Sequence, residues 1–157
     1  MCVLSERLRG EFMLMREIMF RGKALEDGHN FKAGEFVYGS LVFEGDAPYI
    51  VGPVIEANED YIAHEWWVPV DPTTVGQCTG LKDMHGVKLY EGDIMGFHAY
   101  GYYYIGVVQY SNAGAAFGVK CKTASETETC PYLDVVINNH RAVKIGNIHD
   151  NPELLKT

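Results

Sequence analysis

Short apolar stretches, separated by turn-forming residues, recur along most of this chain. Gly, Pro, Asn and Asp stand at the breaks, and few apolar stretches exceed ten residues. Apolar stretches of this length with such breaks are typical of β-strands joined by tight turns. The pattern therefore predicts a mostly β protein. The expected strands cover residues 36–43, 49–51, 65–70, 94–100, 102–110, 116–121, 133–137 and 142–148.

The same pattern divides the chain and predicts helices only near its ends. Asp71-Pro72-Thr73-Thr74 interrupts the strand pattern, which predicts an N-terminal β region at 15–70 and a small barrel-like half at 71–157 packed on it. At the C-terminus, Asp150 or Asn151 can cap a short helical turn that has Pro152 at its first position. Near the N-terminus, apolar residues recur at helical spacing behind Ser5, which predicts an amphipathic helix.

Two turns dominate the run from Gly76 to Met95. In the first, Asp83 can open a tight turn and Gly86 can adopt positive φ, so a hairpin is expected around 82–86. In the second, Gly92-Asp93 lies between apolar positions and begins another strand.

This run resembles the shared core of the YopX family of bacteriophage and prophage proteins. The matching motif residues include Gly80, Asp83, Gly86, Glu91, Gly92 and Asp93, whereas Cys78 replaces a family Tyr. Residues 15–21 (Met-Arg-Glu-Ile-Met-Phe-Arg) resemble the opening motif of the family, and 145–155 resemble its closing motif, with Asp150 in place of Glu. The resemblance implies a phage-type protein of no established activity. The strand openings are also similar to those of SH3-like barrels.

Family members begin at the equivalent of Met15, so residues 1–14 form an extension with two interpretations. It could be the amphipathic helix described above, docked on the barrel or on a neighbouring subunit. Alternatively, Arg9-Gly10-Glu11 can be encoded by a purine-rich ribosome-binding sequence, and the native start is then Met15. We favour the second interpretation, which mass spectrometry of the native N-terminus would test.

The net charge of the chain bears on which kinds of molecule it can bind. The chain has 157 residues and a formal net charge of −8, from 21 acidic and 13 basic side chains. Such a charge repels a phosphate backbone and disfavours nucleic acid as a ligand. An acidic protein can instead imitate DNA and inhibit a host protein, although solubility alone explains the charge.

No residue pattern predicts catalysis, a cofactor or a metal site. The four cysteines form no Cys-x-x-Cys pair, and the six histidines are scattered. Phosphate-binding, nucleophile-elbow and metalloprotease motifs are missing from the sequence. Glu91 and Asp93 could bind a divalent cation, but a turn in which Asp93 accepts backbone hydrogen bonds explains them with fewer assumptions. We expect a non-enzymatic protein of the cytoplasm, because neither a secretory signal nor a membrane-length apolar run is found.

A group of aromatic residues is the best candidate for an interaction surface. If 97–105 formed one strand, His98, Tyr100, Tyr102 and Tyr104 would share a face and present an aromatic stripe. Alternatively, Gly101 turns the chain into a hairpin and the tyrosines form cross-strand pairs. Because Lys and Arg are missing nearby in the sequence, a stripe would favour a protein interface between subunits. We therefore expect a self-associating interaction module that binds a host or phage protein, with a nucleic-acid-binding barrel or a DNA mimic as alternatives.

Overall fold

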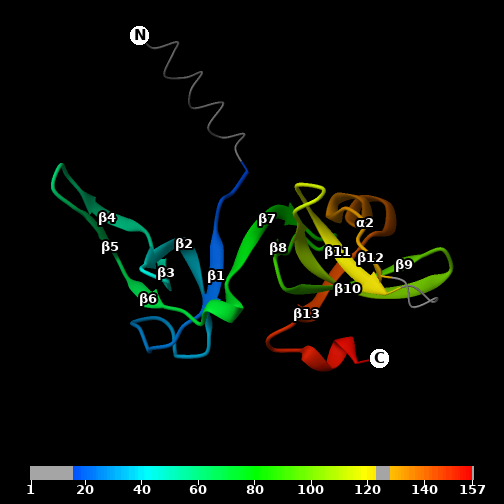
Figure 1. The fold of residues 1–157 in the computed structure, drawn as a ribbon, viewed down its shortest axis with the longest axis horizontal. Coiled ribbons are helices and arrows are strands. Elements are labelled where there is room, and N and C mark those ends of the chain that lie inside the picture. Colours follow the sequence, from blue (N-terminus) through cyan, green and yellow to red (C-terminus); the bar gives the residue numbers. More distant parts are fainter. Residues whose placement is uncertain (1–15, 123–127, 157) are drawn as a thin grey trace, which may run out of the picture.

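The computed structural model describes residues 16–122 and 128–156, which form two large β-sheets side by side, each with an apolar core, and a small two-stranded sheet (Figure 1). Strands dominate, and the prediction of a mostly β protein is confirmed. The predicted N-terminal helix and the extension at 1–14 lie outside the described residues.

The first sheet has six strands in the order β6-β3-β2-β1-β7-β8 and contains the N-terminal region. Its core is formed by Ile50, Val68 and Val70, with Trp66 packed against them. A separate two-stranded hairpin, formed by β4 and β5, extends from this sheet (Figure 1). The strands are β1 (Phe20–Lys23), β2 (Phe36–Glu44), β3 (Ala47–Val51), β4 (Val54–Ala57), β5 (Ile62–His64), β6 (Trp67–Pro69), β7 (Gly76–Lys82) and β8 (Lys88–Tyr90).

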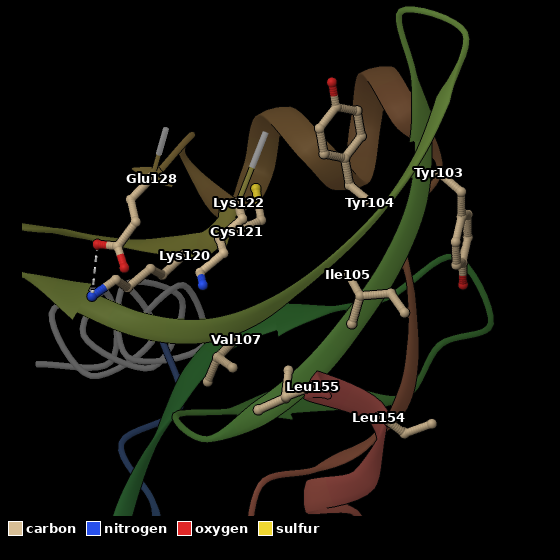
Figure 2. Close-up of a pocket in the computed structure, with 10 residues that line it drawn as sticks. All are labelled: Tyr103, Tyr104, Ile105, Val107, Lys120, Cys121, Lys122, Glu128, Leu154 and Leu155. Carbon is tan, nitrogen blue, oxygen red and sulfur yellow. Dashed lines mark ion pairs between the residues drawn. The ribbon is translucent and has the colours of Figure 1, made fainter. Parts of the chain in front are cut away.

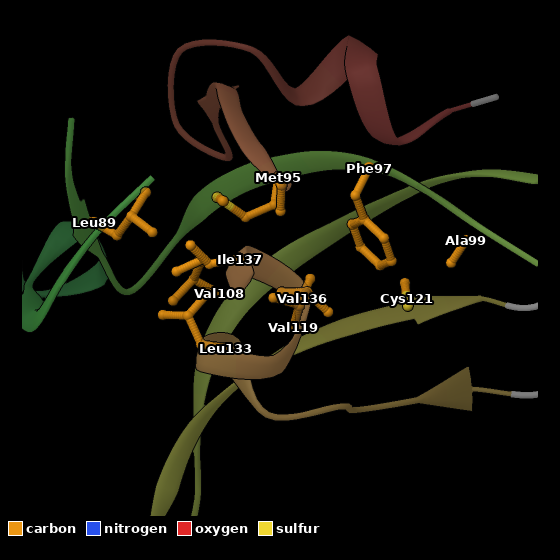
Figure 3. Close-up of a cluster of buried hydrophobic side chains, with 11 residues drawn as sticks. Leu89, Met95, Phe97, Ala99, Val108, Val119, Cys121, Leu133, Val136 and Ile137 are labelled. Atoms are coloured by element: carbon orange, nitrogen blue, oxygen red, sulfur yellow. The ribbon is translucent and has the colours of Figure 1, made fainter. Parts of the chain in front are cut away.

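The second sheet has five antiparallel strands in the order β12-β11-β10-β9-β13. Helix α2 (Leu133–His140) covers one face, where Leu133, Val136 and Ile137 pack on Met95 and Val119 (Figure 3). The strands are β9 (Asp93–Ala99), β10 (Tyr102–Ser111), β11 (Ala116–Lys122), β12 (Glu128–Thr129) and β13 (Val143–Asn147).

Short 3₁₀ helices lie at the break predicted at 71–74 and at the helical turn predicted near the C-terminus. The turn η1 (Pro72–Thr74) follows β6, and Asp71 caps it by accepting the Thr73 N–H at 2.9 Å. The division into regions at Asp71 stays a prediction. The turn η2 (Pro152–Leu155) ends the described chain, with Pro152 in its first turn as expected.

Two expectations about the C-terminal half were wrong. Across the described residues its sheet is open, not a closed barrel, because β12 and β13 are separate edges. Residues 133–137, expected as a strand, begin helix α2. A short apolar run fits either element, and here Leu133, Val136 and Ile137 fall at helical spacing and bury one face against the sheet.

Candidate functional site

The three motifs that carry the family resemblance meet where the two sheets join. β1 comes from the opening motif, the turn between β8 and β9 from the middle one, and the end of β13 from the closing one. β1 pairs with β7, so the opening motif lies beside the chain that leads into the middle motif. We call the contacts among these segments the junction.

A buried ion pair forms the centre of the junction. Arg21 Nη1 lies 2.8 Å from Asp93 Oδ1, and the two side chains are 1% and 0% exposed. Lys144 Nζ approaches the same oxygen at 3.0 Å, while Asp93 Oδ2 accepts the Tyr90 N–H at 2.8 Å. Asp93 therefore has a cation or a donor at each oxygen, as a buried carboxylate requires.

Two aromatic rings lie against the Arg21 guanidinium. Its central carbon lies 4.5 Å from the centroid of Phe36 and 5.1 Å from that of Tyr90. Arg21 Nη2 also donates to the Glu91 carbonyl at 3.2 Å, whereas Nε has no hydrogen-bond partner among the described residues. Cation–π contacts and one carboxylate thus replace the hydration of the buried guanidinium.

A second, more exposed ion pair closes the rim of the junction. Lys23 Nζ pairs with Asp150, whose other oxygen accepts from Asn147 Nδ2 at 3.0 Å. The Asn147 side-chain oxygen in turn accepts the N–H groups of His149 and Asp150, both at 3.0 Å. The hydrogen bonds from Lys23 and Asn147 lower the pKa of Asp150 below its ordinary value.

His149 packs against the first sheet at this rim. Its ring stands edge-on to Phe36, with the centroids 5.9 Å apart. Burial lowers the pKa of His149, and the Arg21 and Lys23 cations lower it further, although Asp150 and Asp71 partly oppose them. The neutral imidazole is therefore the form that fits the junction.

The motif residues at the first turn form a local hydrogen-bonding unit. Asp83 Oδ1 accepts the N–H groups of His85 and Val87 at 2.8 and 2.9 Å, and Oδ2 accepts that of Lys144 at 2.9 Å. Burial alone would raise the pKa of Asp83, but these three backbone donors outweigh it and lower the pKa. Asp83 thus stabilises its own turn and fixes β13 beside it.

The motif glycines have backbone conformations that exclude most side chains: Gly86 and Gly92 lie in turns, and Gly80 lies inside β7 where its pairing with β8 is irregular. Gly80, Gly86 and Gly92 have φ values of +80°, +79° and +86°. Glu91, beside Gly92, accepts the Gln77 N–H through Oε1 at 3.0 Å. Glu91 and Asp93 thus point to different partners and do not form a carboxylate pair for a cation.

The charged residues of the junction stabilise the fold. Arg21 and Asp93 are almost completely inaccessible to solvent, so a substrate does not reach them. Among residues 16–122 and 128–156, no three His, Cys, Asp or Glu side chains gather as metal ligands. The arrangement joins two sheets and leaves no free acid–base pair at its centre.

The interaction surface expected at 97–105 has a different geometry. Tyr100 and Gly101 form the turn of a β9–β10 hairpin, with φ values of +52° and +82°. His98, Tyr100, Tyr102 and Tyr104 therefore do not share one face, and the continuous stripe was wrong because the chain reverses at Gly101.

Cross-strand pairs set the actual faces of this hairpin. His98 pairs with Tyr103 on the face opposite α2, with ring centroids 4.8 Å apart. Tyr104 pairs with Phe97 on the α2 face, where it is half-buried and stacks at 5.5 Å. The Tyr103 ring lies across Gly96, where a Cβ would come within 2.1 Å of the tyrosine hydroxyl.

The end of this hairpin, which we call the aromatic tip, is the most exposed aromatic feature of the second sheet. It consists of Tyr100, Tyr102 and Tyr103, which are 85%, 59% and 52% exposed. A cleft of about 490 Å³ lies beside it on the α2 face, lined by Phe97, Tyr104 and Val136. A second groove is lined by Tyr103 and His98 together with His140 and Arg141 from the end of α2.

Sequence reasoning missed the cations of the junction and the basic residues at the tip. Arg21 stands in the opening motif and Asp93 in the middle one, and a buried carboxylate requires a cation or several hydrogen-bond donors. That requirement could have drawn attention to Arg21. The approach of His140 and Arg141 to the tyrosines depended on residues 133–140 being a helix, which the pattern did not predict.

The fold and the junction together define an all-β protein of two joined sheets, with groups of exposed aromatic and apolar side chains on two of its hairpins. None of the helices in the described part of the chain has the length and apolarity of a bilayer-crossing segment. The chain belongs to the YopX family, because residues 41–156 match the family model described as YopX protein. The matched range contains the middle and closing motifs and confirms the resemblance, whereas the opening motif at 15–21 lies before it. No curated protein matches the chain.

Proposed function

We propose that this protein is a phage accessory protein that acts in the host cytoplasm by binding other proteins, including copies of itself, and not by catalysis. Family membership supports the phage assignment. The junction supports a binding role indirectly, because its charged groups are already paired with one another.

The observation that carries this proposal is the aromatic tip. Three tyrosines with at least half of their surface exposed gather at one hairpin end, beside an apolar cleft. Tyrosine supplies a large contact area with few rotatable bonds and a polar end, and it is enriched at protein–protein interfaces. A partner with an apolar surface and a few hydrogen-bonding groups would fit this tip.

A second candidate is binding to single-stranded nucleic acid at the same tip. The fold brings Arg141 and His140 to the groove lined by Tyr103 and His98, and Arg141 thus supplies a cation that is missing nearby in the sequence. Bases could stack on the tyrosines while Arg141 contacts phosphate. The net charge of −8 opposes this candidate and places it second.

A pull-down of tagged protein from host lysate, with and without nuclease, tests both candidates. The wild type is compared with Tyr100→Ser/Tyr102→Ser/Tyr103→Ser and with the control Tyr132→Ser, which removes a tyrosine 53% exposed away from the tip. The proposal expects a nuclease-resistant protein in stoichiometric amount, retained by the control and lost by the triple variant. Capture that disappears with nuclease would instead establish nucleic-acid binding, and capture that the triple variant retains would exclude the tip.

A further inference from the structure

The β4–β5 hairpin, which we call the arm, is an apolar element exposed to solvent. It points away from the second sheet (Figure 1). Val54, Ile55 and Ile62 are 54%, 67% and 63% exposed. Within the described chain the arm is a sheet of two strands with open edges, an arrangement that is marginally stable in water and available for pairing.

The charges on the arm are all of one sign. Residues 54–67 contain Glu56, Glu59, Asp60 and Glu65 and neither Lys nor Arg. The turn at the end of the arm is ordered by Asn58, whose side-chain oxygen accepts the N–H groups of Asp60 and Tyr61 at 2.8 and 3.1 Å. The arm thus presents a defined apolar surface with an acidic end, which a basic, apolar groove would complement.

Such a groove exists at the other side of the molecule. It lies on the face of the second sheet opposite α2, between β10, β11 and η2, and has a volume of about 480 Å³ (Figure 2). Its apolar part comes from Ile105, Val107, Leu154 and Leu155, and its basic part from Lys120 and Lys122.

The groove keeps a positive charge although one carboxylate lines it. Lys120 Nζ pairs with Glu128 at 3.1 Å, with both side chains about half exposed. Lys122 has no ion pair among the described residues. The groove therefore complements the acidic arm in charge as well as in apolar character.

We propose that the arm of one copy docks in this groove of a second copy, and that two antiparallel copies exchange arms in a reciprocal dimer. An arm and a groove on opposite sides of one chain cannot meet within that chain. In two copies related by a two-fold axis, each arm occupies the groove of the other copy. No arm or groove then remains free to add a third copy. This inference rests on the self-association in the proposed function and assigns it to a groove that borders the aromatic tip, because Tyr103 lines one end of the groove.

Complementary charge reversal tests the contact. In the arm variant, Glu59→Lys/Asp60→Lys, the end of the arm becomes basic and faces a basic groove. In the groove variant, Lys120→Glu/Lys122→Glu, an acidic arm faces an acidic groove. Each variant alone should dimerise about 100-fold more weakly than the wild type, because like charges then meet at both contacts. An equimolar mixture of the two variants places opposite charges at both contacts. The mixed dimer should therefore form with about the same dissociation constant as the wild-type dimer.

Sedimentation equilibrium measures these dissociation constants, and urea unfolding verifies that every variant is folded. The matched control is Glu44→Lys/Asp46→Lys, which makes the same change of charge at the β2–β3 turn and should dimerise like the wild type. The inference is overturned if the folded variants stay monomeric when mixed, or if the wild type dimerises and both variants do so equally well. The proposed self-association itself fails only if the wild type is monomeric at all concentrations, so the two failures are distinguishable.

Discussion

The junction and the exposed hairpins both contain charged and aromatic residues, but the two regions differ in how far these residues are buried and paired. At the junction, Arg21 and Asp93 are buried, and their charges and hydrogen bonds are directed inward. On the arm and the aromatic tip, carboxylates and tyrosines are exposed and have few partners within the chain. The motif residues that carry the family resemblance are therefore used mainly to build the fold, and the surfaces suited to binding lie outside them.

This difference explains why family membership gives a fold and not an activity. A motif of turn glycines and a paired aspartate specifies how two sheets join. A tyrosine hairpin or an acidic arm can change without disturbing that joint, because neither supplies a group to it. Substitutions in the two regions should then separate stability from binding.

The largest expected effect is at the centre of the junction. Replacing Asp93 with Ala leaves Arg21 buried without its carboxylate and should lower the free energy of unfolding by ~3–5 kcal/mol. Urea denaturation followed by tryptophan fluorescence measures the change. Glu17→Ala, which breaks the exposed pair with Lys88, is the control and should have a much smaller effect. Equal losses in the two variants would contradict a central role for the buried pair.

A smaller loss is expected at the turn that carries Asp93. Gly92 has φ of +86°, so Gly92→Ala places a Cβ in the left-handed region and should lower the free energy of unfolding by roughly 1–2 kcal/mol. The added Cβ meets neighbours only at ordinary distances of 3.5 Å or more, so the cost comes from the backbone. Thermal unfolding would detect it. Gly114→Ala, in a turn without positive φ, should leave stability nearly unchanged. A comparable loss in this variant would show that the positive φ of Gly92 is not the cause.

Local chemistry explains which parts of this fold were predictable. The turns at Asp83–Gly86 and at Gly92-Asp93 follow from residues that act on their own neighbours, and the sequence suffices to locate them. The run at 133–137 was assigned to the wrong element because its apolar residues suit a strand or a helix, and packing against Met95 and Val119 decided the outcome.

The junction depended on contacts between distant parts of the chain. Nothing local to Arg21 indicates that Asp93 and Phe36 will surround it, because the pairing of β1 with both β2 and β7 brings them together. The same limit applies at the aromatic tip. The hairpin at Gly101 was one of two alternatives, whereas the position of Arg141 beside Tyr103 required the tertiary fold.

His149 at the rim of the junction should also make stability depend on pH. Because the pKa of His149 is lowered in the folded state, the unfolded chain binds more protons, and stability should fall as the pH decreases below about 6.5. The loss is complete once the pH is below the folded pKa. His149→Gln should flatten this part of the profile in urea denaturation at a series of pH values. A profile that this variant leaves unchanged would exclude His149 as the cause.

The smallest effects on stability are expected at the aromatic tip. Tyr100→Ser and Tyr102→Ser remove side chains that are 85% and 59% exposed, so each should change the free energy of unfolding by less than about 0.5 kcal/mol. Tyr104→Ser should cost more, because this half-buried ring stacks on Phe97 at 5.5 Å. Urea unfolding of the three variants ranks them directly. If Tyr100 or Tyr102 proved as costly as Tyr104, the tip would belong to the core, and its tyrosines would no longer be free to bind a partner.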